Sequence, residues 1–333
     1  MKGWIRRWAA QVLDFPGVAN VLVRDRERLG IIFVMHRFED PETGVGGMPP
    51  SALRELLAGL RRKKIRLASL VELLEIAGTP EPPPGPWVVF TLDDGYEDQV
   101  RTGLPIFQEF DAPATLFPIT GFVDARLWPW WDQVEYLVGK EASAESLVES
   151  LKLRSGSERN EALVDLATSV AIEIPGKPPV SYSPASWDDL RRWEAAGLHV
   201  GCHTDSHPIL SRESEGVVTG ELKGSWDRLC TELRDPKPIL ALPNGRWSID
   251  YGEREAELAR TLGFEYGLSG EGGYLLGYGS STPEEQGEWH PFRLPRFFLG
   301  ADVPHTARIL SGLAPVSKRT LGARSQDTEE DRP

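Results

Sequence analysis

The sequence predicts an α/β protein with parallel strands, and two observations lead to this prediction. The expected strands are continuous apolar runs, as at residues 31–35 and 87–92, rather than runs in which apolar and polar residues alternate. Such runs are typical of parallel strands that are covered on both faces. Strand-like and helix-like segments also follow one another in turn, which is typical of strands joined by crossover helices. With 333 residues, the chain could form one barrel-sized domain or two ordinary domains.

The elements can be assigned in chain order. Strands are expected at residues 31–35, 87–92, 114–119, 198–202, 239–242, 264–268 and 292–299. Helices are expected at residues 51–62, from residue 69, in a stretch that ends near residue 110, and at residues 186–196, 215–233 and 251–262. Ser51 is a suitable N-cap for the first helix. Five prolines between residues 79 and 86 favour an extended connector before the second strand.

Three segments depart from this alternation. Residues 1–29 form a lead segment ahead of the main domain, which we expect to span residues 30–310. Residues 125–183 begin with a cluster of tryptophans, continue with a polar helical region and end in a proline-rich stretch, so we interpret them as an insertion at one loop. Residues 317–333 are charged and lack any apolar run, and we expect a disordered tail there.

Composition excludes several classes of protein. The formal net charge of −13 disfavours nucleic-acid binding, which needs clustered basic residues. Two cysteines are too few for a disulfide scaffold. No apolar stretch approaches the roughly 20 residues of a transmembrane helix, and no apolar run of signal-peptide length follows Arg6 and Arg7. We therefore expect a cytoplasmic protein, with peripheral membrane contact through residues 2–13 left open and the oligomeric state unknown.

Two groups of polar residues directly follow predicted strands. Asp93 and Asp94 follow the second strand, and Gly95 then allows a sharp turn. His203 and His207 follow the fourth strand, with a spacing that would place both imidazoles on one face of a helical turn. Taken alone, the Asp-Gly pair is explained better by a turn that caps the next helix, and the histidine pair is explained equally well by chance or capping. Together, at strand ends that meet on one side of a parallel barrel, they predict a catalytic metal site of two histidines and one carboxylate.

These residues also carry a family resemblance. Residues 91–95, Thr-Leu-Asp-Asp-Gly, and residues 203–208, His-Thr-Asp-Ser-His-Pro, resemble the first two motifs of the NodB-type polysaccharide deacetylases, carbohydrate esterase family four. Residues 242–245, Leu-Pro-Asn-Gly, resemble the third motif in the variant of the poly-N-acetylglucosamine deacetylases. The likeness extends over roughly residues 30–300. It implies a deformed (β/α)7 barrel of the NodB-homology type with an inserted loop and helical segment.

The resemblance assigns roles to matching residues. The implied metal ligands, most often for Zn²⁺, are Asp94, His203 and His207. Asp93 would act as the general base toward the attacking water. The implied substrate-binding residues are Pro243, Asn244 and Gly245, to which we add Trp131 and Trp247 as side chains able to stack on sugar rings.

Some family features are absent, which leaves the general acid open. Ala241 stands where the third motif usually has an arginine, the fourth motif is not recognisable, and residues 294–297, Leu-Pro-Arg-Phe, replace the histidine of the fifth. Residues 32–36, Ile-Phe-Val-Met-His, resemble the version in which a histidine ends the first strand. We therefore expect His36 as the acid, with His290 as the alternative, although a buried structural histidine explains His36 nearly as well. Arg296 would orient Asp93 or a substrate acid group.

The predicted function is the metal-dependent removal of an N-acetyl group, with release of acetate, from an amino-sugar glycan or a lipid-linked saccharide intermediate of exopolysaccharide synthesis. Three alternatives stay open. They are O-deacetylation, deformylation or another small amide hydrolysis at the same site, and carbohydrate binding by a pseudoenzyme.

Overall fold

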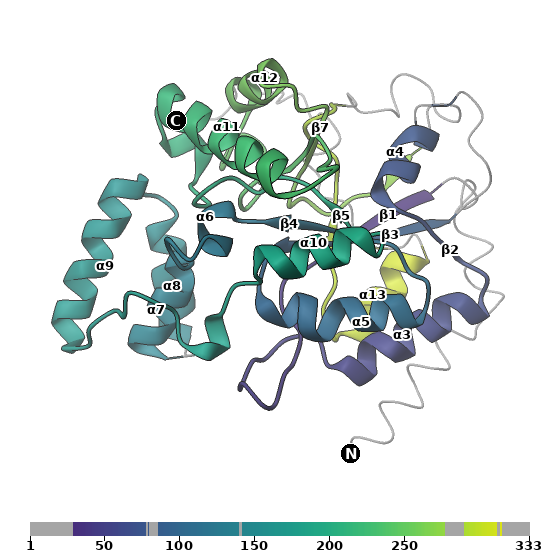
Figure 1. Ribbon diagram of the computed structural model, residues 1–333, viewed down its shortest axis with the longest axis horizontal. Helices are drawn as coiled ribbons and strands as arrows, with labels where there is room; N and C mark the ends of the chain where they lie inside the picture. Colours follow the sequence, from purple (N-terminus) through teal and green to yellow (C-terminus); the bar gives the residue numbers. More distant parts are fainter. Residues whose placement is uncertain are drawn as a thin grey trace, which may run out of the picture.

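The computed structural model describes residues 29–77, 79, 86–139, 142–276, 290–311 and 314. The predicted disordered tail and nearly all of the predicted lead segment lie outside these residues. Seven strands of the described chain run parallel and form the centre of the molecule (Figure 1). They are β1 (Leu29–Met35), β3 (Trp87–Asp94), β4 (Ala114–Pro118), β5 (His199–Val200), β6 (Ile239–Ala241), β7 (Tyr266–Leu268) and β9 (Phe297–Phe298).

The pairing of these strands closes a ring. β1 pairs with β3, β3 with β4, β4 with β5, and β6 with β7, all in parallel. A single bridge from Cys202 to Leu240 joins β5 to β6, and another from Leu268 to Leu294 joins β7 to the chain before β9. β9 pairs with β1 and completes the ring. The protein is thus a (β/α)7 barrel, deformed at the two joints where one bridge replaces a ladder, and the predicted fold class is confirmed.

Two short strands extend the sheet at its edges. β2 (Arg66–Leu67) runs parallel to the first residues of β3, ahead of the point where β4 begins to pair. β8 (Leu275–Leu276) pairs antiparallel with the first residues of β1. Both lie at the amino ends of the central strands, so they leave the carboxyl ends open.

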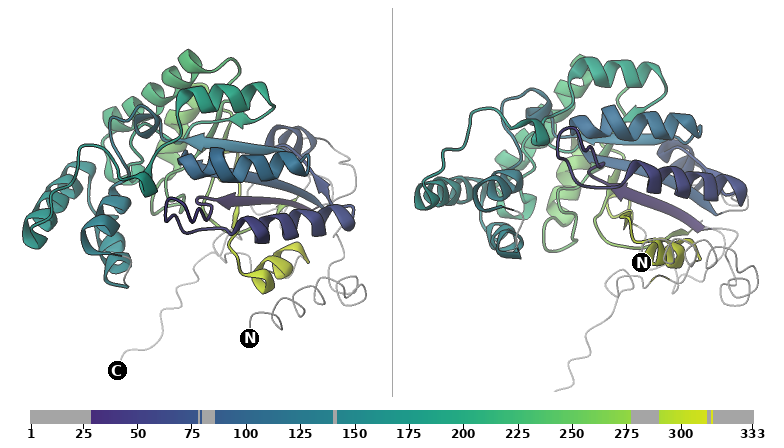
Figure 2. Two further views of the ribbon diagram at one scale, coloured as in Figure 1. Left: turned by 60° about the horizontal axis from the view of Figure 1, so that its bottom comes forward. Right: turned by 90° about the horizontal axis from the view of Figure 1, so that it is seen from below.

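Helices cover the outside of the barrel (Figure 2). They are α3 (Pro50–Arg62), α4 (Leu70–Ala77), α5 (Leu104–Glu109), α10 (Trp187–Ala195), α11 (Glu215–Glu232), α12 (Glu253–Thr261) and α13 (Val303–Leu310). Ser186 and Ser214 cap α10 and α11 with their hydroxyl groups, as helix N-caps commonly do. The expected cap at Ser51 is wrong, because α3 already begins at Pro50, and proline suits the first turn of a helix.

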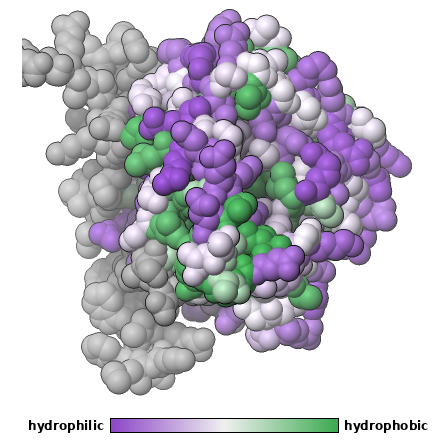
Figure 3. Space-filling view, turned by 90° about the vertical axis from the view of Figure 1, so that its left-hand side faces the viewer, coloured by the Kyte–Doolittle hydropathy of each residue, from purple (hydrophilic) through white to green (hydrophobic). Residues whose placement is uncertain are grey.

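Besides the short 3-10 helix η3 (Val180–Tyr182), the described part of the region predicted as an insertion contains three α-helices. They are α7 (Trp130–Val138), α8 (Ala142–Leu151) and α9 (Gly156–Val170), and they project to one side of the barrel (Figures 1 and 2). The helices share a small core of their own that includes Trp130, Val134 and Leu163. On the face of the molecule that carries them, apolar side chains gather among hydrophilic ones (Figure 3). The insertion is therefore a packing unit attached to one end of the barrel.

The expected strand at residues 292–299 is much shorter in the structure. Only β9 and the bridge at Leu294 take part in pairing. Pro295 lies between them, and proline has no N–H to donate to a ladder. Within the described part of the chain, no helix combines the length and apolarity needed to cross a membrane.

Candidate active site

Side-chain alternation along the strands brings three distant residues into the mouth of the barrel. Ile32, Val89 and Leu294 belong to one buried cluster inside the ring. Side chains two residues apart lie on the same face of a strand. Counting in steps of two from Ile32, Val89 and Leu294 therefore follows the inner face of each strand to its carboxyl end. The three counts end at His36, Asp93 and Arg296, and all three line one cleft. The alternation of side chains that builds the barrel core thus also places these three residues at the active-site end of the barrel.

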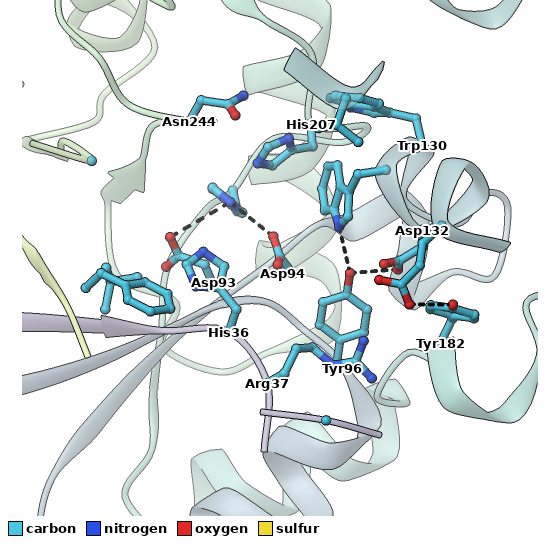
Figure 4. Close-up of a pocket in the computed structure, with 18 of the residues that line it drawn as sticks. His36, Arg37, Asp93, Asp94, Tyr96, Trp130, Asp132, Tyr182, His207 and Asn244 are labelled. Carbon is cyan, nitrogen blue, oxygen red and sulfur yellow. Dashed lines mark hydrogen bonds and ion pairs between the residues drawn. The ribbon is translucent and has the colours of Figure 1, made fainter. Parts of the chain in front are cut away.

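Asp94 reaches the cleft by a different route. Strict alternation would direct it away from Asp93, but Asp94 has a left-handed backbone with φ of 81°. Such a conformation is uncommon for a residue other than glycine and is found often at functional sites. Gly95 follows with φ of 87°, and a side chain there would meet Pro118 at 2.9 Å. The two left-handed residues turn the chain so that both carboxylates face the cleft (Figure 4).

His203 and His207 lie in a loop, so the expected helical turn is wrong. Thr204 and His207 have positive φ values of 65° and 56°, which no right-handed helical turn contains. The Thr204 hydroxyl accepts a hydrogen bond from the His207 N–H at 3.0 Å and holds the loop in this shape. The structure still brings the imidazoles together, with ring centroids 4.7 Å apart.

Asp94, His203 and His207 form a group that could hold a metal ion. One ligand atom from each lies within 4.8 Å of the others, and all three residues are buried. His203 donates its Nδ1–H to the Ala241 carbonyl at 2.7 Å, which leaves Nε2 facing Asp94 Oδ1 at 3.5 Å. A second ring nitrogen fixed in this way is typical of metal-binding histidines.

The protonation of these histidines also suits a cation. Burial, together with the nearby charges of His203 and Arg159, holds the pKa of His207 well below its ordinary value. His207 is therefore neutral, as a ligand must be, and its buried Nδ1 has no partner among the described residues. Burial opposes a charge on His203, but Asp93 and Asp94 outweigh it and raise the pKa of His203. The negative charges of Asp93 and Asp94 thus favour a positive charge at this position.

Asp93 is held by an arginine from the far end of the barrel sequence. Arg296 donates Nη1–H to Asp93 Oδ1 and Nη2–H to Oδ2, each at 2.8 Å, and both side chains are buried. Arg296 also donates to the Thr91 hydroxyl and to the Ser269 carbonyl. Burial raises the pKa of Asp93, but the charges of Arg296 and His203 offset this and lower it overall. Asp93 is therefore an ionised carboxylate in a fixed orientation.

The cleft above these residues has a volume of about 520 Å³, within the range of small-molecule sites. It brings together most of the residues singled out from the sequence. Those that line it are His36, Asp93, Asp94, Trp131, His203, His207, Asn244 and Arg296. The Trp131 ring contacts His207, with centroids 4.6 Å apart.

Four other candidates do not line the cleft. Trp247 packs between Tyr251 and His290, outside the lining of the cleft, and its expected role in sugar stacking stays a prediction. His290 accepts a hydrogen bond from the Phe292 N–H at this same contact, away from the cleft lining. Pro243 and Gly245 flank Asn244 without lining the cleft, and a side chain on Gly245 would meet the Gly270 nitrogen at 2.2 Å.

The sequence reasoning missed several residues of the cleft. They include Arg37, Tyr96, Asp132, Tyr182 and Phe298. Tyr96 directly follows Asp-Asp-Gly and Phe298 continues the inward-facing series of Arg296, so both had a signal in the sequence. Asp132 and Tyr182 had none, because they enter the cleft through the packing of the insertion.

A parallel α/β barrel with buried carboxylates and histidines at the carboxyl ends of its strands defines an α/β-barrel enzyme. The family model described as "Polysaccharide deacetylase" matches residues 81–267, more than half of the chain. The protein belongs to the polysaccharide deacetylase family. The predicted NodB-type membership and the prediction of a hydrolase acting on non-peptide carbon–nitrogen bonds are confirmed at the level of the family.

Individual relatives agree with the family. The poly-β-1,6-N-acetyl-D-glucosamine N-deacetylase of Escherichia coli K12 is 38% identical over 74 residues, which are 22% of this chain and 11% of that protein. The chain thus matches only about a tenth of the length of this curated relative. The Streptococcus pyogenes deacetylase PplD has a TM-score of 0.58 at 18% identity, over 87% of this chain and 100% of that one. IcaB from Ammonifex degensii has a TM-score of 0.57 at 17% identity, over 85% and 97%. These two likenesses concern the fold.

Proposed function

We propose that this protein is a metal-dependent N-deacetylase that releases acetate from a polysaccharide of N-acetylhexosamine units. The observation that carries the proposal is the buried group of Asp94, His203 and His207 beside the ion pair of Asp93 and Arg296. The local similarity to an N-deacetylase of poly-β-1,6-N-acetyl-D-glucosamine supports this class of polymer as the substrate.

The three ligand residues fit a divalent cation, with Zn²⁺ as the best candidate. Two imidazoles and one carboxylate are a common set for catalytic zinc. The neutral His207, with its unpartnered Nδ1, and the fixed tautomer of His203 meet the chemical needs of such a site. A cation held there supplies Lewis-acid polarisation of the acetyl carbonyl and lowers the pKa of water at the site.

The neighbouring residues then divide the proton transfers. Asp93 accepts the proton of the attacking water, because it is ionised and held by Arg296. His36 lies in the cleft near Asp93 and donates a proton to the departing nitrogen. Asn244 also lines the cleft, and its buried Nδ2 has no partner among the described residues, so it is free to donate to a substrate oxygen.

The test is acetate release from N-acetylated oligosaccharides by zinc-loaded enzyme, with chelator-treated enzyme and the Asp93→Asn variant as controls. We expect release that stops with chelator and is absent in the variant. Release of formate from N-formyl analogues without release of acetate would instead identify a deformylase. Release of acetate from O-acetylated chains alone would identify an O-deacetylase. Binding of the saccharide without any release would identify a carbohydrate-binding pseudoenzyme. A cytoplasmic location stays a prediction.

A further inference from the structure

The cleft extends beyond the residues that the proposed reaction uses. Its second half is built mainly by the insertion, through Trp130, Trp131, Asp132 and Tyr182. Figure 4 shows Asp132 and Tyr182 on the far side of Tyr96 from the Asp93–Asp94 pair. The proposed chemistry gives these side chains no task.

A chain of hydrogen bonds fixes Asp132 at this position. Trp131 donates its Nε1–H to the Tyr96 hydroxyl at 3.1 Å, and Tyr96 donates to Asp132 Oδ2 at 2.7 Å. Because the Trp131 ring also contacts His207, this one indole ring links the group of Asp94, His203 and His207 to the hydrogen bonds of Tyr96 and Asp132. Asp132 is therefore connected to His207 through two side chains, Trp131 and Tyr96, and lies on a different part of the cleft wall.

Asp132 is a buried carboxylate that makes no ion pair or hydrogen bond with a basic side chain among the described residues. It is only 5% exposed, and its hydrogen bond comes from the neutral Tyr96 hydroxyl. The nearby guanidinium of Arg37 stacks on the Tyr96 ring at 3.9 Å but donates to Asp98 at 2.7 Å and to the Ser181 carbonyl at 2.6 Å. Burying a carboxylate without a cation is costly. A cationic group that enters the cleft would remove that cost.

Trp130 provides a second, independent sign of a ligand on the same helix. Its side chain is 6% exposed and lines the cleft, and its buried Nε1–H has no acceptor among the described residues. Buried donors are almost always paired in folded proteins. Among the described residues, the wall therefore offers a carboxylate that no cationic side chain bonds and an N–H donor that lacks an acceptor. A sugar with a free amine carries both complementary groups, since it has an ammonium group and hydroxyl oxygens.

We propose that Asp132 binds the ammonium group of an already deacetylated hexosamine that neighbours the acetylated residue in the same chain. The proposal rests on the proposed function, because it takes the acetylated residue to lie at Asp94, His203 and His207. The amine formed in the reaction itself lies at that centre, on the other side of Trp131, so the amine at Asp132 belongs to another sugar. The enzyme would then favour partly deacetylated chains over fully acetylated ones.

The first test is binding, which does not depend on turnover. A fully deacetylated glucosamine oligosaccharide is titrated into the zinc-loaded enzyme and its variants by calorimetry. Asp132→Asn removes the charge, keeps the shape and still accepts from Tyr96, so we expect about tenfold weaker binding, or about 1.4 kcal/mol. The matched control is Asp188→Asn, which removes one charge from an exposed carboxylate of α10 and should leave binding unchanged. Equal affinity of Asp132→Asn and wild type would overturn the proposal.

The second test separates this proposal from the proposed function. Acetate release is compared for two oligosaccharides of equal length, one fully acetylated and one with a single free amine beside an acetylated residue. We expect wild type to have the higher kcat/KM on the amine-bearing chain, and Asp132→Asn to lose that preference while it still acts on the acetylated chain. A preference that persists in the variant would contradict the role of Asp132. Absence of release from both chains would contradict the proposed function, and the binding result would still decide the ammonium site.

Discussion

The ion pair between Asp93 and Arg296 leads to a quantitative prediction that a double-mutant cycle can test. The three variants are Asp93→Asn, Arg296→Gln and the combination of both. Both side chains are 3% exposed, and two N–H groups of Arg296 meet the two oxygens of Asp93 at 2.8 Å. The pair is thus buried and bidentate, which is the geometry in which charge pairs interact most strongly.

The expected magnitudes follow from the burial of both charges. Each single variant leaves one buried charge without its partner and should lose about 3–5 kcal/mol of unfolding free energy. The double variant leaves neither charge, so its loss should fall short of the sum by about 2 kcal/mol or more. Arg296 also bonds Thr91 and Ser269, but those contacts are lost in Arg296→Gln and in the double variant alike, so they cancel in the cycle.

The measurement is urea unfolding followed by the fluorescence of the chain's 11 tryptophans, in the presence of chelator so that metal binding does not contribute. Single-variant losses that simply add up in the double variant would refute the reasoning. They would mean that Asp93 and Arg296 are not paired in the folded protein, and that Arg296 does not position the proposed base.

Three further predictions concern the metal, the acid and pH. His203→Ala removes a ligand nitrogen, so zinc per chain, measured by atomic emission, should fall far below that of wild type; an unchanged zinc content would contradict the ligand set. His36→Ala should lower kcat about a hundred- to ten-thousand-fold at unchanged zinc content, and an unchanged kcat would show that His36 is not the acid. Burial raises the pKa of Asp132 to about 7, and the Tyr96 hydrogen bond and the Arg37 charge only partly oppose this. The charged and titratable groups that face Asp132 are Tyr96, Arg37, Asp94, Glu135 and Tyr182. Because the folded state holds this proton more tightly than the unfolded chain, the resulting stabilisation is complete below about pH 4 and is lost as the pH rises through about 7. Unfolding measurements across this range should show a loss on the order of 4 kcal/mol in wild type that is absent in Asp132→Asn; the same pH dependence in both proteins would contradict it.

Much of the fold and of the reacting centre could be predicted from local patterns. The apolar runs that form β1, β3 and β4 can be recognised from consecutive residues alone, so these strands lie where they were expected. The groups at Asp93–Asp94 and His203–His207 follow such runs, and parallel strands bring their carboxyl ends to one side. The shape of the histidine loop was predicted wrongly, because the left-handed residues Thr204 and His207 leave no trace in sequence spacing.

The sequence by itself therefore determined a parallel α/β barrel, the end of the barrel that carries the chemistry, and the residues able to hold a metal. Only the tertiary structure decided which residues share the cleft. Closure of the ring joins Arg296 to Asp93 across 203 positions of the chain, and packing of the insertion brings Asp132 to Tyr96 while Trp247 turns away. A local sequence pattern reports the period of a single strand or helix. Contacts between distant residues depend instead on how whole elements pack, which the residues next to them in the sequence do not specify.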